Sequence, residues 1–213
     1  MGREFYIASC IFTAQFPHLS QRIQRYVAQR RGISVVRCCV PQYKLREFEE
    51  KMPEECRAGW RALPDSGDFQ AGDRVYSLCH NCSNLIEESR PGVQVSSLWE
   101  LILSDGQFPY PDYSPRTVTV QDCWRAKERR AEQGAVRTLL GKMGLDVVEL
   151  EENFQRTEFC GPSLYRPQPP RNPQLAPLHY EKNAKGKFLP HTEEEQRALM
   201  EEYCRRFSTR EVV

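Results

Sequence analysis

Cysteines at the ends of predicted strands are the feature that most constrains how this chain can fold. Three short apolar or β-branched runs have the pattern of buried strands: Phe5–Ala8, Ile33–Val36 and Val75–Leu78. A cysteine follows each run within two residues, and together five cysteines form the pattern C-x27-CC-x39-CxxC: Cys10, Cys38, Cys39, Cys79 and Cys82. Apolar residues at helical spacing between Pro17 and Arg31, followed by Gly32, predict a strand–helix–strand unit with parallel strands. Because ligands collect beyond the carboxyl ends of parallel strands, we expect the five thiols to meet at one sheet edge.

Composition excludes several classes of protein. The 213 residues suffice for one large domain or two small ones, and 30 basic against 29 acidic residues leave a net charge of +1. This charge gives no broad field for attracting nucleic acid. No apolar run is long enough to cross a bilayer, and Met1–Phe5 lacks the apolar core of a signal peptide. We therefore predict a cytoplasmic protein without a transmembrane segment or a nucleic-acid partner, in which the nine cysteines serve as ligands or redox groups rather than as disulfide staples.

The second half of the chain repeats the first strand–helix–strand pattern. Val118–Val120 predicts a strand that ends near Cys123, and a helix is predicted over residues 125–143. The segment Gly144–Val148 then repeats the form of Gly32–Val36. The distance from the first cysteine to the glycine is almost the same in the two halves, which indicates an internal repeat.

The second copy is incomplete. A single cysteine, Cys160, stands in the place of the Cys38–Cys39 pair. The last residues, Arg210–Val213, align with the strand that leads into the CxxC of the first half, so the sequence stops where a second CxxC would begin. Many prolines after Gly161 predict a loop without regular structure, and a capping-box pattern predicts a helix over residues 192–207.

The predicted fold is α/β, with two tandem Rossmann-like βαβ units related by a pseudo-repeat, the second one degenerate. We expect three segments: a unit with the complete five-cysteine motif at 1–107, a Pro/Tyr-rich linker at 108–115 and the degenerate unit at 116–213.

The five-cysteine motif allows more than one chemical interpretation. Five converging thiolates would repel one another unless a metal core neutralised them, and sulfur ligands stabilise iron in iron–sulfur clusters. Zinc is the alternative, since four thiols can make a closed tetrahedral site, although adjacent cysteines are strained as one half of that chelate. Buried free thiols are a third interpretation, and we expect it to hold for the isolated Cys56 and Cys204. A thioredoxin-like dithiol at Cys79 and Cys82 leaves the other three cysteines unexplained.

Three further residues are candidates near this site. His80, inside the CxxC, can hydrogen-bond a cluster sulfur or supply a proton, or it can simply point to solvent. Cys123 and Cys160 are candidates for a vestigial second site or a redox-active pair, or they are inert.

The tandem pattern resembles the cysteine-rich CCG domains of the heterodisulfide reductase B-subunit family. The resemblance covers most of the chain and is strongest at Cys10, Cys38–Cys39, Cys79–Cys82, Asp122–Cys123 and Phe159–Gly161. It implies that Cys10, Cys38, Cys39, Cys79 and Cys82 hold a noncubane [4Fe-4S] cluster. The second unit lacks the doubled cysteine and the CxxC, so one cluster is expected rather than two.

The same resemblance implies an iron–sulfur oxidoreductase subunit of a larger complex. Such a protein transfers electrons or reduces a small-molecule disulfide, with a ferredoxin-like protein or a flavoprotein as electron partner. The alternative function is a non-catalytic zinc-binding or interaction protein that uses the same cysteines.

Overall fold

The structure, a computed structural model, describes residues 2–158, 172–186 and 191–213. The chain divides into two compact units, Met1–Leu98 and Trp99–Val213, which are described separately here. Both units combine parallel strands with helices, so the protein has a mixed α/β fold. The division between the units falls before residue 107, at the end of the last strand of the first unit.

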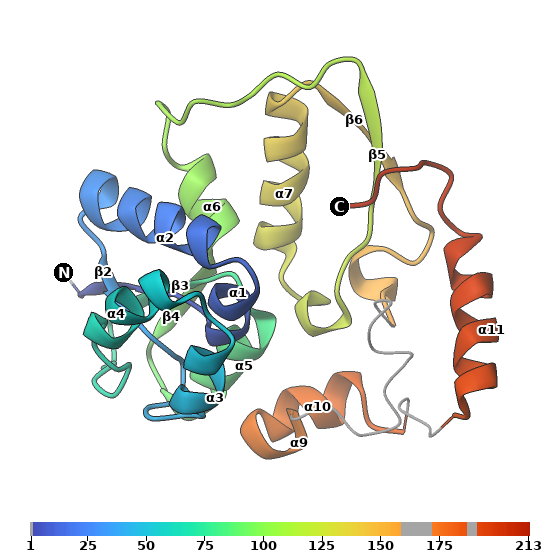
Figure 1. The fold of residues 1–213 in the computed structure, drawn as a ribbon. Helices are drawn as coiled ribbons and strands as arrows, with labels where there is room; N and C mark the ends of the chain where they lie inside the picture. Colours follow the sequence, from blue (N-terminus) through green and yellow to red (C-terminus); the bar gives the residue numbers. More distant parts are fainter. Residues whose placement is uncertain (1, 159–171, 187–190) are drawn as a thin grey trace. The chain divides into compact units, whose positions relative to one another are not determined.

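The first unit is built on a four-stranded parallel sheet with the order β2-β1-β3-β4 (Figure 1). The strands are β1 (Glu4–Ile7), β2 (Ser34–Val36), β3 (Arg74–Ser77) and β4 (Gln94–Ser97). Three of them match the strands predicted from the sequence, and β4 was not predicted. The chain moves from β1 to one neighbour and later returns to the other, which makes the β1/β3 boundary the switch point of the sheet.

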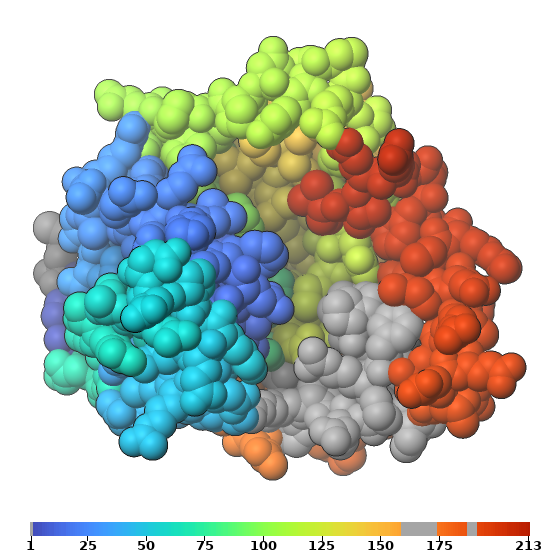
Figure 2. Space-filling model, viewed as in Figure 1, coloured from blue at the N-terminus to red at the C-terminus, as the bar shows by residue number. Residues whose placement is uncertain are grey.

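Helices connect the strands of the first unit. They are α1 (Cys10–Gln15), α2 (Pro17–Arg25), the π-helical turn η1 (Tyr26–Arg30), α3 (Leu45–Glu50), α4 (Glu54–Ala62), α5 (His80–Ser89) and, across the unit boundary, α6 (Leu98–Leu103). The core is apolar and formed by strands and helices together, with Tyr6, Ile7, Val27, Val75 and Ile86 almost inaccessible to solvent. In Figure 2 the segments from α1 to α4, coloured blue to cyan, form one continuous packed surface.

The second unit contains a parallel strand pair. It consists of β5 (Arg116–Val120), the 3₁₀ turn η2 (Trp124–Ala126), α7 (Arg130–Lys142), β6 (Leu145–Glu149), the 3₁₀ turn η3 (Phe154–Arg156), α9 (Asn172–Leu175), α10 (Pro177–Asn183) and α11 (Glu193–Cys204). Val118 and Val120 of β5 pack with Leu140 of α7 in the core. The end of the chain adds to this sheet, because Val212 forms a parallel bridge with Thr119 on β5.

A glycine in the left-handed conformation precedes the second strand of each unit. Gly32 has a φ of 67° before β2, and Gly144 has a φ of 72° before β6. Both glycines follow a helical segment, where this backbone conformation ends the helix and a side chain would be strained. The two positions are the ones that the sequence aligns with each other.

Two predictions about the second half need correction. The prolines were expected to exclude regular structure after Gly161, but α9 and α10 form at 172–175 and 177–183, the latter with Pro177 at its first position, where no backbone N–H is needed. The helix predicted over 125–143 begins only at Arg130, after a separate 3₁₀ turn. The capping box at Thr192 and Glu195 is confirmed.

None of the helices among the described residues combines the length and the apolar character that crossing a bilayer would require.

Candidate metal centre

The cysteines of the motif lie at the carboxyl edge of the first unit's parallel sheet. Cys10 begins α1 three residues after β1, Cys38 and Cys39 follow β2, and Cys79 follows β3 and caps α5. Cys82 lies in the first turn of α5. Since β1 and β3 flank the switch point, Cys10 and Cys79 stand at the position where parallel sheets bind their ligands.

The turn after β1 is shaped to bring Cys10 to this edge. The pairing of β1 with β2 continues one residue beyond the strand, where the Ala8 N–H donates to the Val36 carbonyl. Ser9 then takes a positive φ of 49°, which turns the chain into α1. The Thr13 hydroxyl donates to the Ala8 carbonyl at 2.5 Å and fastens α1 to the end of the strand.

Cys38 and Cys39 follow a buried arginine. Arg37, directly after β2, forms an ion pair of 2.8 Å with Asp65, and its backbone N–H donates to the Pro64 carbonyl. These contacts tie the residues after β2 to the segment before β3. Cys38 is almost completely buried, with 1% of its surface exposed, whereas Cys39 is partly exposed.

The CxxC is fixed by a short hydrogen-bonded turn. The Cys79 N–H donates to Ser77 Oγ at 3.0 Å, and the Ser77 hydroxyl donates to the Cys79 carbonyl at 3.2 Å. The Ser83 N–H also donates to the Cys79 carbonyl, which closes the first turn of α5. A cysteine at the cap and another three residues later therefore lie on the same side of the helix start.

Hydrogen bonds and charges connect all five thiols. Cys38 donates to Cys10 Sγ, Cys82 donates to Cys79 Sγ, and Cys82 also interacts with Cys39. The thiols of Cys10 and Cys79, and those of Cys38 and Cys39, are close enough to affect each other's charge. The five cysteines that the sequence motif singled out thus come together in the folded unit, and none of them forms a disulfide.

The hydrogen bonds divide the thiols into acceptors with lowered pKa values and donors with raised pKa values. The hydrogen bond from Cys82, assisted by backbone N–H groups and by the charge of His80, lowers the pKa of Cys79 to about 6. The hydrogen bond from Cys38 lowers the pKa of Cys10. The pKa values of the donor thiols shift in the opposite direction. Hydrogen bonding and burial raise the pKa of Cys38 and of Cys82 well above the ordinary thiol value.

The five sulfur atoms do not all lie at the separation that one zinc ion imposes on its ligands. A tetrahedral zinc ion with Zn–S bonds of about 2.3 Å holds its sulfur atoms about 3.8 Å apart. Among the described residues, no three of these five sulfur atoms lie within 4.8 Å of one another. The thiols instead form a pair, Cys10 with Cys38, and a group of three around Cys82.

A buried phenol beside the thiols has no partner. Tyr6 on β1 is completely buried, and its hydroxyl has no hydrogen-bond partner. Burial, followed by the charge of Cys82, raises the pKa of Tyr6, so the hydroxyl keeps its proton. An orphaned donor next to converging thiols fits a site that receives an electron-rich group. The sequence pattern placed Tyr6 in a strand, but its period-two pattern gave no indication of this polar role.

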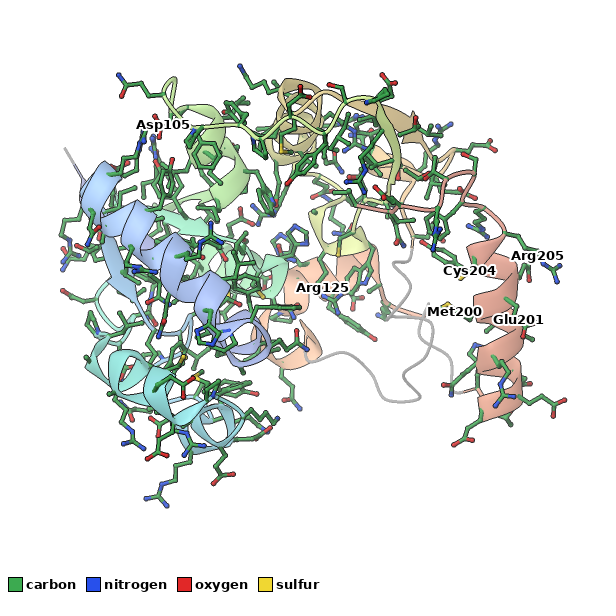
Figure 3. All side chains as sticks on the ribbon, turned by 45° about the horizontal axis from the view of Figure 1, so that its top comes forward. Asp105, Arg125, Met200, Glu201, Cys204 and Arg205 are labelled. Carbon is green, nitrogen blue, oxygen red and sulfur yellow. The ribbon has the colours of Figure 1, made fainter. Side chains whose placement is uncertain are left out.

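The remaining candidate residues have different surroundings. His80 is the first residue of α5, partly buried, and influences Cys79 through its charge. Cys123 is a partly buried residue at the start of η2 in the second unit, and Cys160 lies outside the described residues. Cys56 is buried as expected, but Cys204 is exposed on α11, one turn after Met200 (Figure 3), which corrects the expectation of a buried thiol there.

Comparison with known proteins gives no relative on which to base a function: no protein-family model, no curated protein and no solved structure matches this chain.

Proposed function

We propose that the protein is an iron–sulfur redox protein of the heterodisulfide reductase B type, with a [4Fe-4S] cluster held by Cys10, Cys38, Cys39, Cys79 and Cys82. The observation that carries the proposal is the convergence of these five thiols at the β1/β3 switch point. The unpartnered Tyr6 hydroxyl supports a site that accepts an electron-rich group.

The repeat relationship supports the same family assignment. Each unit has a parallel strand pair joined through a helix and a left-handed glycine, and the central strands β1 and β5 each gain a further parallel neighbour on the other side. In the first unit this neighbour is β3, which leads into the CxxC, and in the second unit it is the end of the chain. The arrangement agrees with two CCG-type units.

The residues around the site would have different roles in binding such a group. Cys79, with a pKa of about 6, is a thiolate at neutral pH and is ready to bind iron, whereas Cys38 and Cys82 must each release a proton. The Tyr6 hydroxyl, which has no partner of its own, would be available to donate to such a group and so stabilise added negative charge. When bound, the cluster would supply one-electron redox chemistry.

The reaction class that we propose is disulfide reduction or electron transfer within a larger complex. Reduction of a disulfide breaks one S–S bond, consumes two electrons and two protons and yields two thiols. The electrons come from a partner, a reduced ferredoxin-like protein or a flavoprotein, and we assign the supply of a proton to His80, the first residue of α5.

The test is the metal content of protein purified without oxygen. About four iron and four acid-labile sulfide per chain, with a visible absorption band, are expected for the wild-type protein. The variant with Cys38→Ser and Cys39→Ser is expected to lose both together, while Cys204→Ser, which removes an exposed thiol of the other unit, retains them. The absence of both iron and sulfide from the wild-type protein would contradict the proposal. Zinc lost in the Cys38/Cys39 variant, without sulfide, would support the zinc-binding alternative.

A further inference from the structure

Three potential metal ligands outside the five-thiol site lie close together in the first unit. His18 is the second residue of α2, and Glu55 and Cys56 lie in the first turn of α4. One ligand atom from each side chain can be chosen so that all three lie within 4.8 Å of one another. His18 is distant in sequence from the adjacent Glu55 and Cys56 and meets them only because α2 and α4 lie side by side (Figure 1).

The donor set has the chemistry of a zinc site. Imidazole nitrogen, carboxylate oxygen and thiolate sulfur are the three ligand types that zinc uses in proteins, and tetrahedral zinc places such donors about 3.3 to 3.8 Å apart. Small rotations of His18 and Glu55, both exposed on short helical turns, can close the remaining distance. One neutral imidazole, one carboxylate and one thiolate also balance the two positive charges of the ion.

A small cavity borders the buried member of this group. The cavity holds about 50 Å³ and is lined by Cys56, by Trp60 on the next turn of α4 and by residues of α2. Trp60 is 2% exposed, and its indole N–H has no hydrogen-bond partner. A cavity of this size has room for a water molecule, which could accept from this indole N–H. The unsatisfied donor therefore points to a water or anionic ligand in the cavity beside Cys56.

The three ligands differ in burial. Cys56 is 3% exposed and anchors the group from the protein interior, while His18 and Glu55 lie on the surface. An ion bound by these three residues would have its fourth position free for water.

We propose that His18, Glu55 and Cys56 form a zinc site, separate from the five-thiol site, that fastens α2 to α4. Helix α2 belongs to the connection that begins after Cys10, and α4 belongs to the connection that begins after Cys39. Zinc bound here would link these two connections and so hold the segments that carry three of the five thiols. The site needs only residues of the first unit and does not depend on the redox function proposed above.

The test is binding of Zn²⁺ alone to the full chain, with Co²⁺ as a spectroscopic substitute. Zinc affinity is measured by competition with a chelator in the wild-type protein and in His18→Gln, Glu55→Gln and Cys56→Ser. Loss of one ligand is expected to weaken the zinc site at least 100-fold, more than the loss usually seen when an outer-shell partner is removed. Bound Co²⁺ is expected to show a thiolate charge-transfer band that disappears in Cys56→Ser.

Matched controls separate this site from the five-thiol site. His191→Gln and Cys204→Ser remove one imidazole and one exposed thiol from the second unit, and both are expected to leave zinc affinity unchanged. Cys79→Ser is expected to lose iron and sulfide but to keep this zinc ion. Because Cys56 is buried, Cys56→Ser could unfold the protein. In that case the variants at the two exposed positions, His18→Gln and Glu55→Gln, provide the test.

Unchanged zinc affinity in both His18→Gln and Glu55→Gln would overturn the proposal, and so would zinc binding that depends on Cys79 alone. Absence of iron and sulfide from the wild-type protein would count against the redox function but not against this site.

Discussion

Cys82 donates a hydrogen bond to Cys79 Sγ within the first turn of α5, and this contact is the largest of those that lower the pKa of the Cys79 thiol. Cys79 becomes the acidic thiol, while Cys82, buried and also in contact with Cys39, keeps its proton. The same relationship recurs between Cys38 and Cys10. Each hydrogen-bonded pair therefore combines one thiol with a lowered pKa and one that acts as its hydrogen-bond donor.

This inequality predicts the reactivity of the metal-free protein. Because its pKa is lowered to about 6, Cys79 is a thiolate at neutral pH, and its alkylation by iodoacetamide is expected to slow as the pH falls through about 6. Cys38 and Cys82 are expected to remain almost unmodified. Mass spectrometry of peptides after brief labelling at pH 5 to 9 measures each site. In Cys82→Ala the midpoint for Cys79 is expected to move upward, and an unchanged midpoint would show that the hydrogen bond is not its cause.

The orphaned hydroxyl of Tyr6 predicts an unusual stability change. Since a buried donor without a partner costs about 1–3 kcal/mol, Tyr6→Phe is expected to raise the free energy of unfolding of the metal-free protein by about 1 kcal/mol. Urea denaturation measures this. In the metal-loaded protein the same change is expected to lower the reduction potential, because a hydrogen bond to the cluster is lost. Destabilisation of the metal-free protein by Tyr6→Phe would show that the hydroxyl already has a partner.

The ion pair beside the Cys38–Cys39 step predicts a larger loss of stability than a surface pair. Asp65→Ala leaves the buried Arg37 guanidinium without its carboxylate and is expected to cost about 3 kcal/mol in the free energy of unfolding. Glu152→Ala breaks a pair with Arg206 of similar length, 3.0 Å, whose side chains are both over 40% exposed, and is expected to cost less than about 1 kcal/mol. Equal costs for the two variants would contradict a buried role for Arg37.

The strand formed by the end of the chain predicts amide protection in β5. The N–H groups of Thr119 and Gln121 donate to the carbonyls of Glu211 and Val213. The N–H groups of the alternate residues Val118 and Val120 point to the other side, toward β6. In a variant that stops at Arg210, Thr119 and Gln121 are expected to lose hydrogen-exchange protection while Val118 and Val120 retain it. Protection that is unchanged at all four amides would show that the terminal residues do not pair with β5.

The sequence was a good guide to the strands that carry cysteines and a poorer one elsewhere. Alternating and β-branched runs located β1, β2, β3, β5 and β6 because burial of these runs requires a strand. It did not predict β4, whose residues Gln94–Ser97 are mostly polar and pair only because β3 offers them an open edge. The prolines near α9 and α10 were misinterpreted because proline is compatible with a helix at its first turn.

The sequence by itself determined which thiols could share a site, because cysteines placed just after parallel strands must reach the same edge of a sheet. Only the tertiary structure decided how they share it: which thiol donates to which, and that Tyr6, buried near Cys82, has a hydroxyl without a partner. It also brought His18 to Glu55 and Cys56, residues with no common motif, because contacts between α2 and α4 depend on packing and not on spacing along the chain. The spacing of apolar residues indicates whether a segment is a helix or a strand, whereas side-chain contacts between elements depend on the whole fold.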